Sequence, residues 1–122
     1  MLPIVVALLA TSTLAEEDPP ETVVVTYAPR AGREADVEKL VRTHFQTASR
    51  LGLLAVDAPH VTYRDRDAGG KPVVIDVLTW KSHETPDDAP AEIRSIWTQM
   101  EAAVEKRGGK RGIVFHEVAL LR

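Results

Sequence analysis

Residues 72–80 read PVVIDVLTW, and this stretch decides the fold. In an extended chain its side chains fall into two rows, and both rows are apolar apart from one carboxylate. The rows are Val73, Ile75 and Val77 on one side, and Val74, Asp76, Leu78 and Trp80 on the other. Such a strand is typical of the middle of a sheet that is covered on both faces. Asp76 is costly in its row unless it is paired or hydrogen-bonded.

The segment before this strand predicts its hairpin partner. Residues 61–66 alternate between the row Val61, Tyr63 and Asp65 and the row Thr62, Arg64 and Arg66. Residues 67–70 read DAGG, which supplies the residues that a tight turn needs. We therefore expect residues 61–66 and 72–80 to pair as neighbouring antiparallel strands.

Two stretches have the 3.6-residue apolar period of amphipathic helices. The first runs from Gly32 to Leu51, and Gly52 is placed to end it. The second follows a start signal at residues 87–90 and continues to Val104. Two further alternating stretches, residues 22–27 and 113–121, are expected to be strands.

The resulting order is β-α-β-β-α-β. Right-handed crossovers in the two β-α-β halves place residues 22–27 and 72–80 in the middle of a four-stranded antiparallel sheet, with both helices on one face. The expected fold class is α+β, a ferredoxin-like plait. The other face would expose a larger apolar patch than a monomer usually tolerates. We therefore expect a homodimer that forms through this open sheet face.

Composition limits the function classes. The chain has 122 residues, which suits one domain with a modest core. Its formal charge of −3 gives no electrostatic reason to expect nucleic acid as a partner. There is no cysteine, which excludes disulfides, thiolate catalysis, iron–sulfur clusters and zinc–thiolate sites.

The first residues predict export to the periplasm or the medium. Leu2–Ala10 is an apolar run, and the small residues Thr13 and Ala15 stand where a signal peptidase would read them. The run is too short to cross a bilayer as a helix, so we expect no stable membrane span. No Lys or Arg precedes this run, which counts against a signal peptide. If the run is not a signal peptide, we expect the protein to be cytoplasmic. The expected organisation is a signal peptide at residues 1–15, a spacer at 16–21 and one domain at 22–122.

Three stretches carry a resemblance to a known superfamily. They are VVTYAPRAGRE at residues 24–34, DVLTWKS at residues 76–82 and IWTQME at residues 96–101. On these, residues 23–121 resemble the dimeric α+β barrel superfamily, near the antibiotic-biosynthesis-monooxygenase-like domains. The resemblance implies that two plaits pack sheet to sheet and that each subunit keeps a small-molecule pocket between its helices and its sheet.

Members of that superfamily include cofactor-free quinol oxygenases, haem-degrading oxygenases and lactone isomerases. The haem-degrading members use an Asn on the first strand, a Trp near the end of the third and a His on the second helix. Trp80 matches the Trp, but this chain has no Asn and no His at the other two places. We therefore expect neither haem nor another cofactor.

His44 and Asp76 are the candidate catalytic residues. His44 lies on the apolar stripe of the first helix, where an imidazole could act as a general base in a dry pocket. Asp76 would orient the imidazole or stabilise its positive charge. The competing interpretations are a core histidine with a satisfied hydrogen bond, and an ion pair between Asp76 and Arg64 across the hairpin. Whether the two candidates share a face depends on the strand register.

Four aromatic side chains could line a pocket for a planar ligand, although aromatic residues at such positions often only fill the core. They are Tyr27, Tyr63, Trp80 and Trp97. Of the other histidines, His60 and His83 are expected in solvated loops, and His116 on a strand as a ligand or a dimer contact. None has the spacing of a metal site, although His83 and the acidic residues at 84–88 could weakly collect a cation. No metal centre is expected.

Two functional hypotheses follow. In the first, the protein is a small-molecule-binding or monooxygenase-like protein that acts on an apolar or aromatic substrate, which His44 deprotonates so that the anion reacts with oxygen. In the second, it is a non-catalytic dimeric binding or interaction module whose pocket is filled by side chains. A cavity lined by His44 and an aromatic residue would favour the first, and a packed interior the second.

Overall fold

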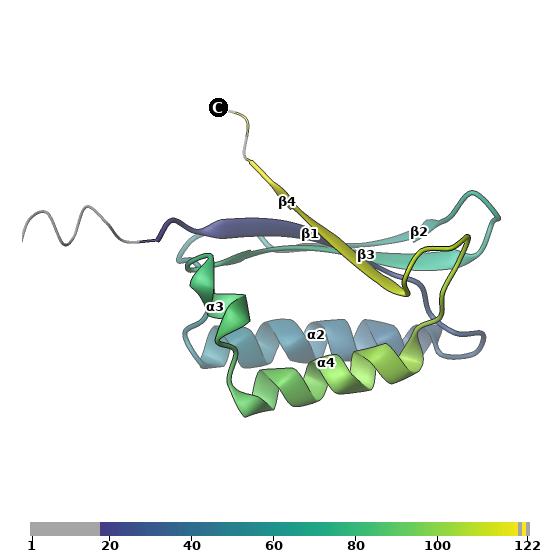
Figure 1. The fold of residues 1–122 in the computed structure, drawn as a ribbon, viewed down its shortest axis with the longest axis horizontal. Helices are drawn as coiled ribbons and strands as arrows, with labels where there is room; N and C mark the ends of the chain where they lie inside the picture. Colours follow the sequence, from purple (N-terminus) through teal and green to yellow (C-terminus); the bar gives the residue numbers. More distant parts are fainter. Residues whose placement is uncertain (1–17, 120, 122) are drawn as a thin grey trace, which may run out of the picture.

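The computed structural model describes residues 18–119 and 121. Its elements, in chain order, are β1 (Glu21–Tyr27), α2 (Glu34–Arg50), β2 (Val61–Arg66), β3 (Pro72–Trp80), α3 (Glu84–Asp87), α4 (Ala91–Ala103) and β4 (Ile113–Val118). The strands form one antiparallel sheet, and α2 and α4 lie together on one side of it (Figure 1). The α+β class and the four-stranded antiparallel sheet predicted from the sequence are confirmed.

The expected signal peptide at residues 1–15 lies outside the described residues, as does the start of the expected spacer at 16–21. β1 begins at Glu21, one residue before the expected strand. Within residues 18–119, no helix has the length and the apolar character needed to cross a membrane.

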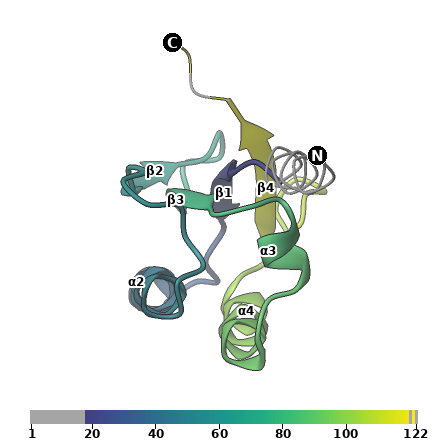
Figure 2. The same ribbon diagram turned by 90° about the vertical axis from the view of Figure 1, so that its left-hand side faces the viewer.

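The strands are arranged in the order β2-β3-β1-β4, so the two most apolar strands are central. The register places Thr62 and Val25 on either side of Asp76, and Phe115 beyond Val25. Directly opposed residues of a sheet point to the same face. This row therefore lies on one face, and the burial of its two central residues shows that it is the face that the helices cover (Figure 2).

The core fills the layer between this face and the helices. Its β1 and β3 members alternate along each strand, and its helical members recur at three- and four-residue spacing. They include Val23, Val25, Tyr27, Val74, Leu78, Val37, Val41, Ile93, Ile96 and Met100. The two helices are therefore held by apolar burial rather than by their own propensity.

The helix ends differ slightly from the sequence prediction. α2 begins at Glu34, two residues after Gly32, and Gly52 follows its end with a φ of +70°, which glycine adopts without strain. α4 ends at Ala103, because Val104 instead forms a bridge with Pro29. The single turn α3 was not predicted. β4 ends at Val118 rather than Leu121, and Val118 is the last residue that pairs with β1, opposite Thr22.

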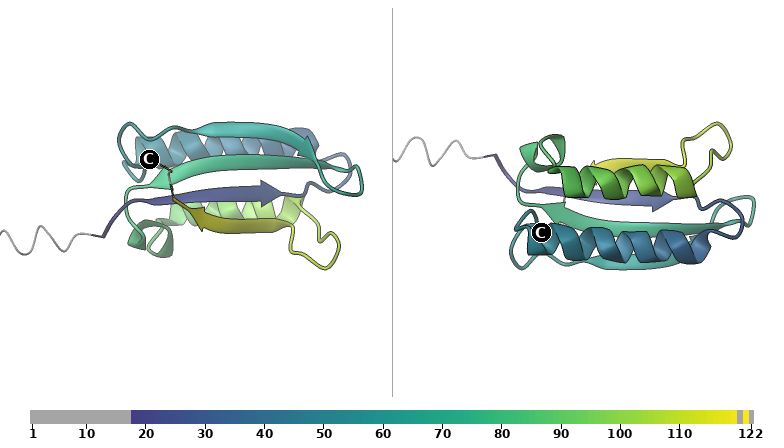
Figure 3. Two further views of the ribbon diagram at one scale, coloured as in Figure 1. Left: turned by 90° about the horizontal axis from the view of Figure 1, so that it is seen from above. Right: turned by 90° about the horizontal axis from the view of Figure 1, so that it is seen from below.

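The opposite face of the sheet carries no other element of residues 18–119 (Figure 3). Its centre holds the half-buried Val24, Ile75 and Val77. Towards the edges the apolar side chains are exposed, and Tyr63 on β2 is 55% exposed. The sheet is therefore apolar on both faces, as predicted, but helices cover only one.

Arg107 ties three loops together at one end of the sheet. Its guanidinium donates to the carbonyl oxygens of Pro29 (2.6 Å) and Pro72 (2.6 Å), and it pairs with Asp67 (3.2 Å) and Glu105 (3.1 Å). The side chain is only 14% exposed. A guanidinium that is mostly buried and donates from all three of its nitrogens holds these loops together.

We predict that Arg107→Ala destabilises the fold by about 2 kcal/mol, because two buried carbonyls lose their charged donor. Urea unfolding measures this loss. The matched control is Arg111→Ala, since Arg111 is 76% exposed and meets Glu101 only at 3.5 Å; it should change stability by less than about 0.5 kcal/mol. Equal losses in the two variants would contradict the structural role of Arg107.

Candidate functional site

α2 brings a histidine into the core. Val37, Val41, His44 and Ala48 form the buried stripe of this helix, and His44 is only 3% exposed. Glu34 and Asp36 in the first turn and Arg50 in the last turn suit the helix dipole. An imidazole at this depth needs polar partners, since burying it without hydrogen bonds is unfavourable.

β3 brings a carboxylate to the same layer. Asp76 lies between the buried residues Val74 and Leu78 on the helix-facing side, and its side chain is 0% exposed. His44 and Asp76 thus both point into the space between α2 and the sheet. The sequence does not show whether Asp76 lies on the side of the sheet that faces His44. The register of the β2–β3 hairpin and the burial of Asp76 show that it does.

Only one oxygen of Asp76 is used by the described residues. Its Oδ1 accepts a hydrogen bond from Thr62 Oγ1 (2.7 Å) and lies 2.8 Å from Nε2 of His60. Its Oδ2 is buried and has no hydrogen-bond partner within residues 18–119. One half of this carboxylate is therefore satisfied, and the other half is available as an acceptor.

The hydrogen bond from Trp97 fixes the tautomer of His44. The indole N–H, which can only donate, points to Nε2 of His44 at 2.9 Å. Nε2 must therefore carry the lone pair, and the proton of the neutral ring is on Nδ1. Nδ1 is buried and has no partner in the described chain. The site thus contains a buried donor without an acceptor and a buried acceptor without a donor.

Burial keeps the His44 ring neutral. The pKa of His44 is lowered to about 4, mainly by burial; the negative charge of Asp76 opposes this shift and His60 adds to it. Burial also raises the pKa of the Tyr27 phenol above its usual range, and Asp76 adds to this shift. Both groups are therefore neutral around pH 7.

Aromatic rings surround the histidine. The Trp80 ring meets His44 edge to face, with centroids 5.6 Å apart, and Trp80 and Trp97 are likewise perpendicular at 6.5 Å. Phe45 and His60 stack in parallel with centroids 3.6 Å apart. Edge-to-face and stacked pairs of this kind hold rings in fixed orientations.

Three of the predicted aromatic residues therefore share the interior with His44 and Asp76, namely Tyr27, Trp80 and Trp97. Tyr63 does not, because it lies opposite Ile75 and points to the open face. The alternative pair between Asp76 and Arg64 is absent from the described residues, since Arg64 instead forms a two-pronged bond with Glu38 at 2.7 and 2.8 Å. That bond holds the pKa of Glu38 below its usual range.

His60 lies in the loop before β2, as predicted, but its side chain is mostly buried and meets Asp76 rather than solvent. The hairpin register could have shown it, because Thr62 lies opposite Asp76 and His60 is two residues earlier on the same face. His116 lies opposite Val24 and faces the open side of the sheet.

His83 was also placed in a solvated loop, with residues 84–88 as its acidic neighbours. It lies instead against Glu21 and Glu117, from β1 and β4. Hydrogen bonds with Glu117 and with the carbonyl of Pro19 raise the pKa of His83.

The two best-formed hollows on the described part of the chain are not lined by His44 or Asp76. The larger, about 620 Å³, lies between the 67–71 turn and the 106–112 loop. The smaller, about 370 Å³, lies beside Glu38 and Arg64. Neither hollow reaches His44, and the rings of Trp80 and Trp97 pack around its imidazole.

Comparisons with known proteins give no family. The chain matched no model of a protein family, no curated protein and no solved structure. The superfamily resemblance seen in residues 23–121 therefore remains an expectation, and the functional argument depends on the geometry of the site.

The depressed pKa of His44 predicts how stability depends on pH. The unfolded chain binds a proton at this ring near pH 6.5 and the folded chain only near pH 4. The unfolded state therefore binds more protons in this window, so stability falls by up to about 3 kcal/mol as the pH drops from 6.5 to 4. Urea unfolding across this range measures the slope.

His44→Gln is the matched variant, because its amide oxygen can still accept the Trp97 bond but cannot titrate. We expect the free energy of unfolding of this variant to lack the decrease between pH 6.5 and pH 4 that His44 causes in the wild type. A variant whose stability falls with pH as steeply as that of the wild type would show that His44 is not the group responsible.

Proposed function

We propose that this protein binds a small hydroxyl-bearing aromatic molecule, a phenol or a quinol, in the layer between the helices and β3. The observation that carries the proposal is the pair of unpartnered buried atoms, His44 Nδ1 and Asp76 Oδ2. Each unsatisfied group costs about 1–3 kcal/mol. A molecule that pairs with both recovers this energy, which is a reason for the protein to keep them.

The two atoms define the chemistry of the ligand. Nδ1–H donates and a carboxylate oxygen accepts, so the ligand needs one acceptor and one donor. A phenolic hydroxyl offers both on a single atom, and a quinol offers them on two. The rings of Trp80 and Trp97 favour a planar aromatic body through edge and face contacts. Apart from these few polar groups, the layer is apolar, as small-molecule sites usually are.

The geometry divides the catalytic roles differently from the sequence expectation. His44 cannot be the base, because its lone pair accepts from Trp97. Asp76 is the acceptor for a ligand proton, and the N–H of His44 stabilises the oxyanion that remains. Thr62 and His60 hold the other carboxylate oxygen in place.

Oxygenation without a cofactor is the reaction that suits this arrangement and the superfamily resemblance. Transfer of the phenolic proton to Asp76 leaves an electron-rich anion. Dioxygen would then add to a ring carbon of the quinol anion, so that one quinol and one O₂ give one hydroxyquinone and one water, and the substrate supplies all four electrons. The protein contributes desolvation and orientation, and needs no electron donor other than the substrate.

A second candidate is a non-catalytic dimeric module. Two observations favour it: both hollows lie away from His44, and the open sheet face is apolar over all four strands. We propose that a second copy covers this face, so that two sheets pack as a dimeric α+β barrel. This dimer is compatible with either function.

We predict that 1,4-naphthohydroquinone binds the wild type and that Asp76→Asn weakens binding at least tenfold. The amide retains Oδ1 for Thr62 but places an N–H₂ group where the free acceptor stood. Thermal shift under anaerobic conditions and fluorescence titration of the two tryptophans measure the affinity. His44→Leu should weaken it similarly, because leucine has no donor to replace Nδ1–H.

Two controls make this test specific. Asp36→Asn removes an exposed carboxylate of α2 and should bind like the wild type. The dimethyl ether of the same quinol has no hydroxyl hydrogen and should bind at least tenfold more weakly than the quinol. Equal affinities for quinol and ether would refute the proposed role of Asp76 and leave the interaction-module candidate.

We predict that the full chain is a dimer at micromolar concentration and that Ile75→Glu makes it a monomer, because a carboxylate would be buried at the centre of the sheet interface. Light scattering measures the mass. Val56→Glu is the control, since Val56 is 88% exposed but lies in the loop before β2. A wild type that stays monomeric overturns the proposed interface.

A further inference from the structure

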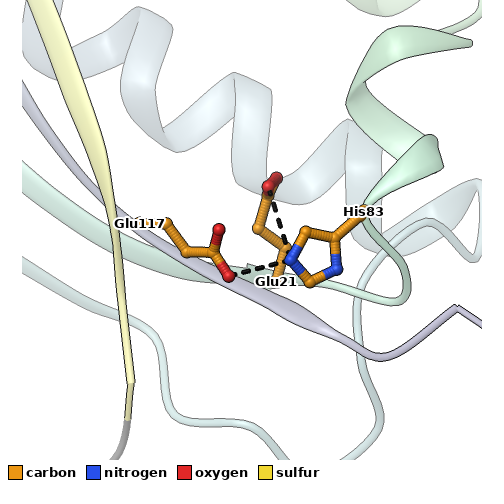
Figure 4. Close-up of side chains that lie close together, drawn as sticks. All are labelled: Glu21, His83 and Glu117. Carbon is orange, nitrogen blue, oxygen red and sulfur yellow. Dashed lines mark hydrogen bonds and ion pairs between the residues drawn. The ribbon is translucent and has the colours of Figure 1, made fainter.

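Three segments far apart in the chain bring potential metal ligands together at one end of the sheet (Figure 4). Glu21 is the first residue of β1, Glu117 lies near the end of β4, and His83 precedes α3. Nε2 of His83 is 2.8 Å from Glu117 Oε2 and 3.9 Å from Glu21 Oε2. Glu117 lies opposite Val23, so it shares a face with Glu21, two residues before Val23.

The imidazole is oriented by a group outside the cluster. Its Nδ1 donates to the backbone carbonyl of Pro19 at 2.9 Å, so Nε2 is the nitrogen that faces the two carboxylates. Metal-binding histidines usually have this arrangement, in which the second nitrogen donates to a carbonyl or a carboxylate. The bond fixes both the tautomer and the ring plane.

The local charge favours a cation. Asp18, Glu21 and Glu117 all place a carboxylate oxygen within 4.0 Å of the His83 ring. Even a protonated imidazole balances only one of these three charges. A divalent ion bound to the neutral imidazole would balance two of the three charges. Asp18 is held beside the ring because its Oδ2 accepts the backbone N–H of Glu84.

We propose that Glu21, His83 and Glu117 form a site for a divalent first-row metal ion, with Zn²⁺ as the best fit. In a tetrahedral zinc site with bonds of about 2.1 Å, ligand atoms lie about 3.4 Å apart. The two observed separations from Nε2 fall on either side of this value, so small side-chain rotations would complete the geometry.

The donor set selects the metal. One imidazole nitrogen and two carboxylates suit Zn²⁺ better than Mg²⁺ or Ca²⁺, which prefer oxygen ligands throughout. Three protein ligands leave a fourth position for water or for a ligand, and Glu117 is half exposed, so this position faces solvent. The site would join the edge strand β4 to the segment before α3, and it is independent of the His44–Asp76 site.

The test is isothermal titration of the full chain, freed of metal with a chelator, with Zn²⁺ alone. We expect one Zn²⁺ per chain, and at least tenfold weaker binding in both Glu117→Gln and His83→Ala. Glu117→Gln is the safer variant, because it changes a half-exposed side chain to one of the same shape. Thermal melting of each metal-free variant checks that it is folded.

Glu101→Gln is the matched control, since it removes an equally exposed carboxylate that pairs only with Arg111 among the described residues. It should bind Zn²⁺ within twofold of the wild type, and a tenfold excess of Mg²⁺ should not displace Zn²⁺. Co²⁺ in place of Zn²⁺ should give the visible absorption of a four-coordinate site, which both ligand variants should lose. No Zn²⁺ binding by the wild type, or equal binding by Glu117→Gln, overturns the proposal.

Discussion

The buried carboxylate of Asp76 is the constraint on which the interior of this protein depends. A charge in the middle of a sheet is tolerated only when neighbouring elements supply hydrogen bonds. Here β2 supplies Thr62 and the loop before it supplies His60. A one-residue slip of the hairpin would move Asp76 to the open face and put Ile75 or Val77 in its place. The Asp67 side chain fixes the register by accepting the backbone N–H groups of Gly69 and Lys71.

His44 extends this polar network to both helices. Trp97 on α4 donates to a ring on α2, so the two helices are joined by a hydrogen bond as well as by apolar contact. Because Nε2 of His44 accepts this bond, the ring offers only its Nδ1–H donor and cannot act as a base. The site therefore pairs a neutral N–H with a free carboxylate oxygen, which suits the binding of a hydroxyl and the stabilisation of its anion.

Much of the fold could be predicted because apolar residues recur along the chain at the spacing of a helix or a strand. The strand at residues 72–80 has the limits expected from its alternation, and the helix that carries His44 is offset by only two residues at its start. The short helix α3 has no apolar period of its own, so no local pattern predicts it. The position of His44 in the interior also follows from periodicity, whereas the face on which Asp76 lies depends on the strand register.

The partners of these residues could be predicted less well, because they depend on distant segments. His60 meets Asp76 through the hairpin register, and His83 meets Glu21 and Glu117 through the pairing of β1 with β4. Nearness in sequence pointed to the wrong acidic neighbours for His83. Tyr63 was assigned to the pocket by residue type, although its alternation places it on the open face.

The most direct test of the central claim is a high-resolution crystal structure of the protein grown with 1,4-naphthohydroquinone under anaerobic conditions. We expect density for an aromatic ring between α2 and β3, with oxygen atoms at hydrogen-bond distance from both His44 Nδ1 and Asp76 Oδ2. A structure in which these two atoms bond directly to each other, or in which side chains close the space and the quinol lies elsewhere, would contradict the account.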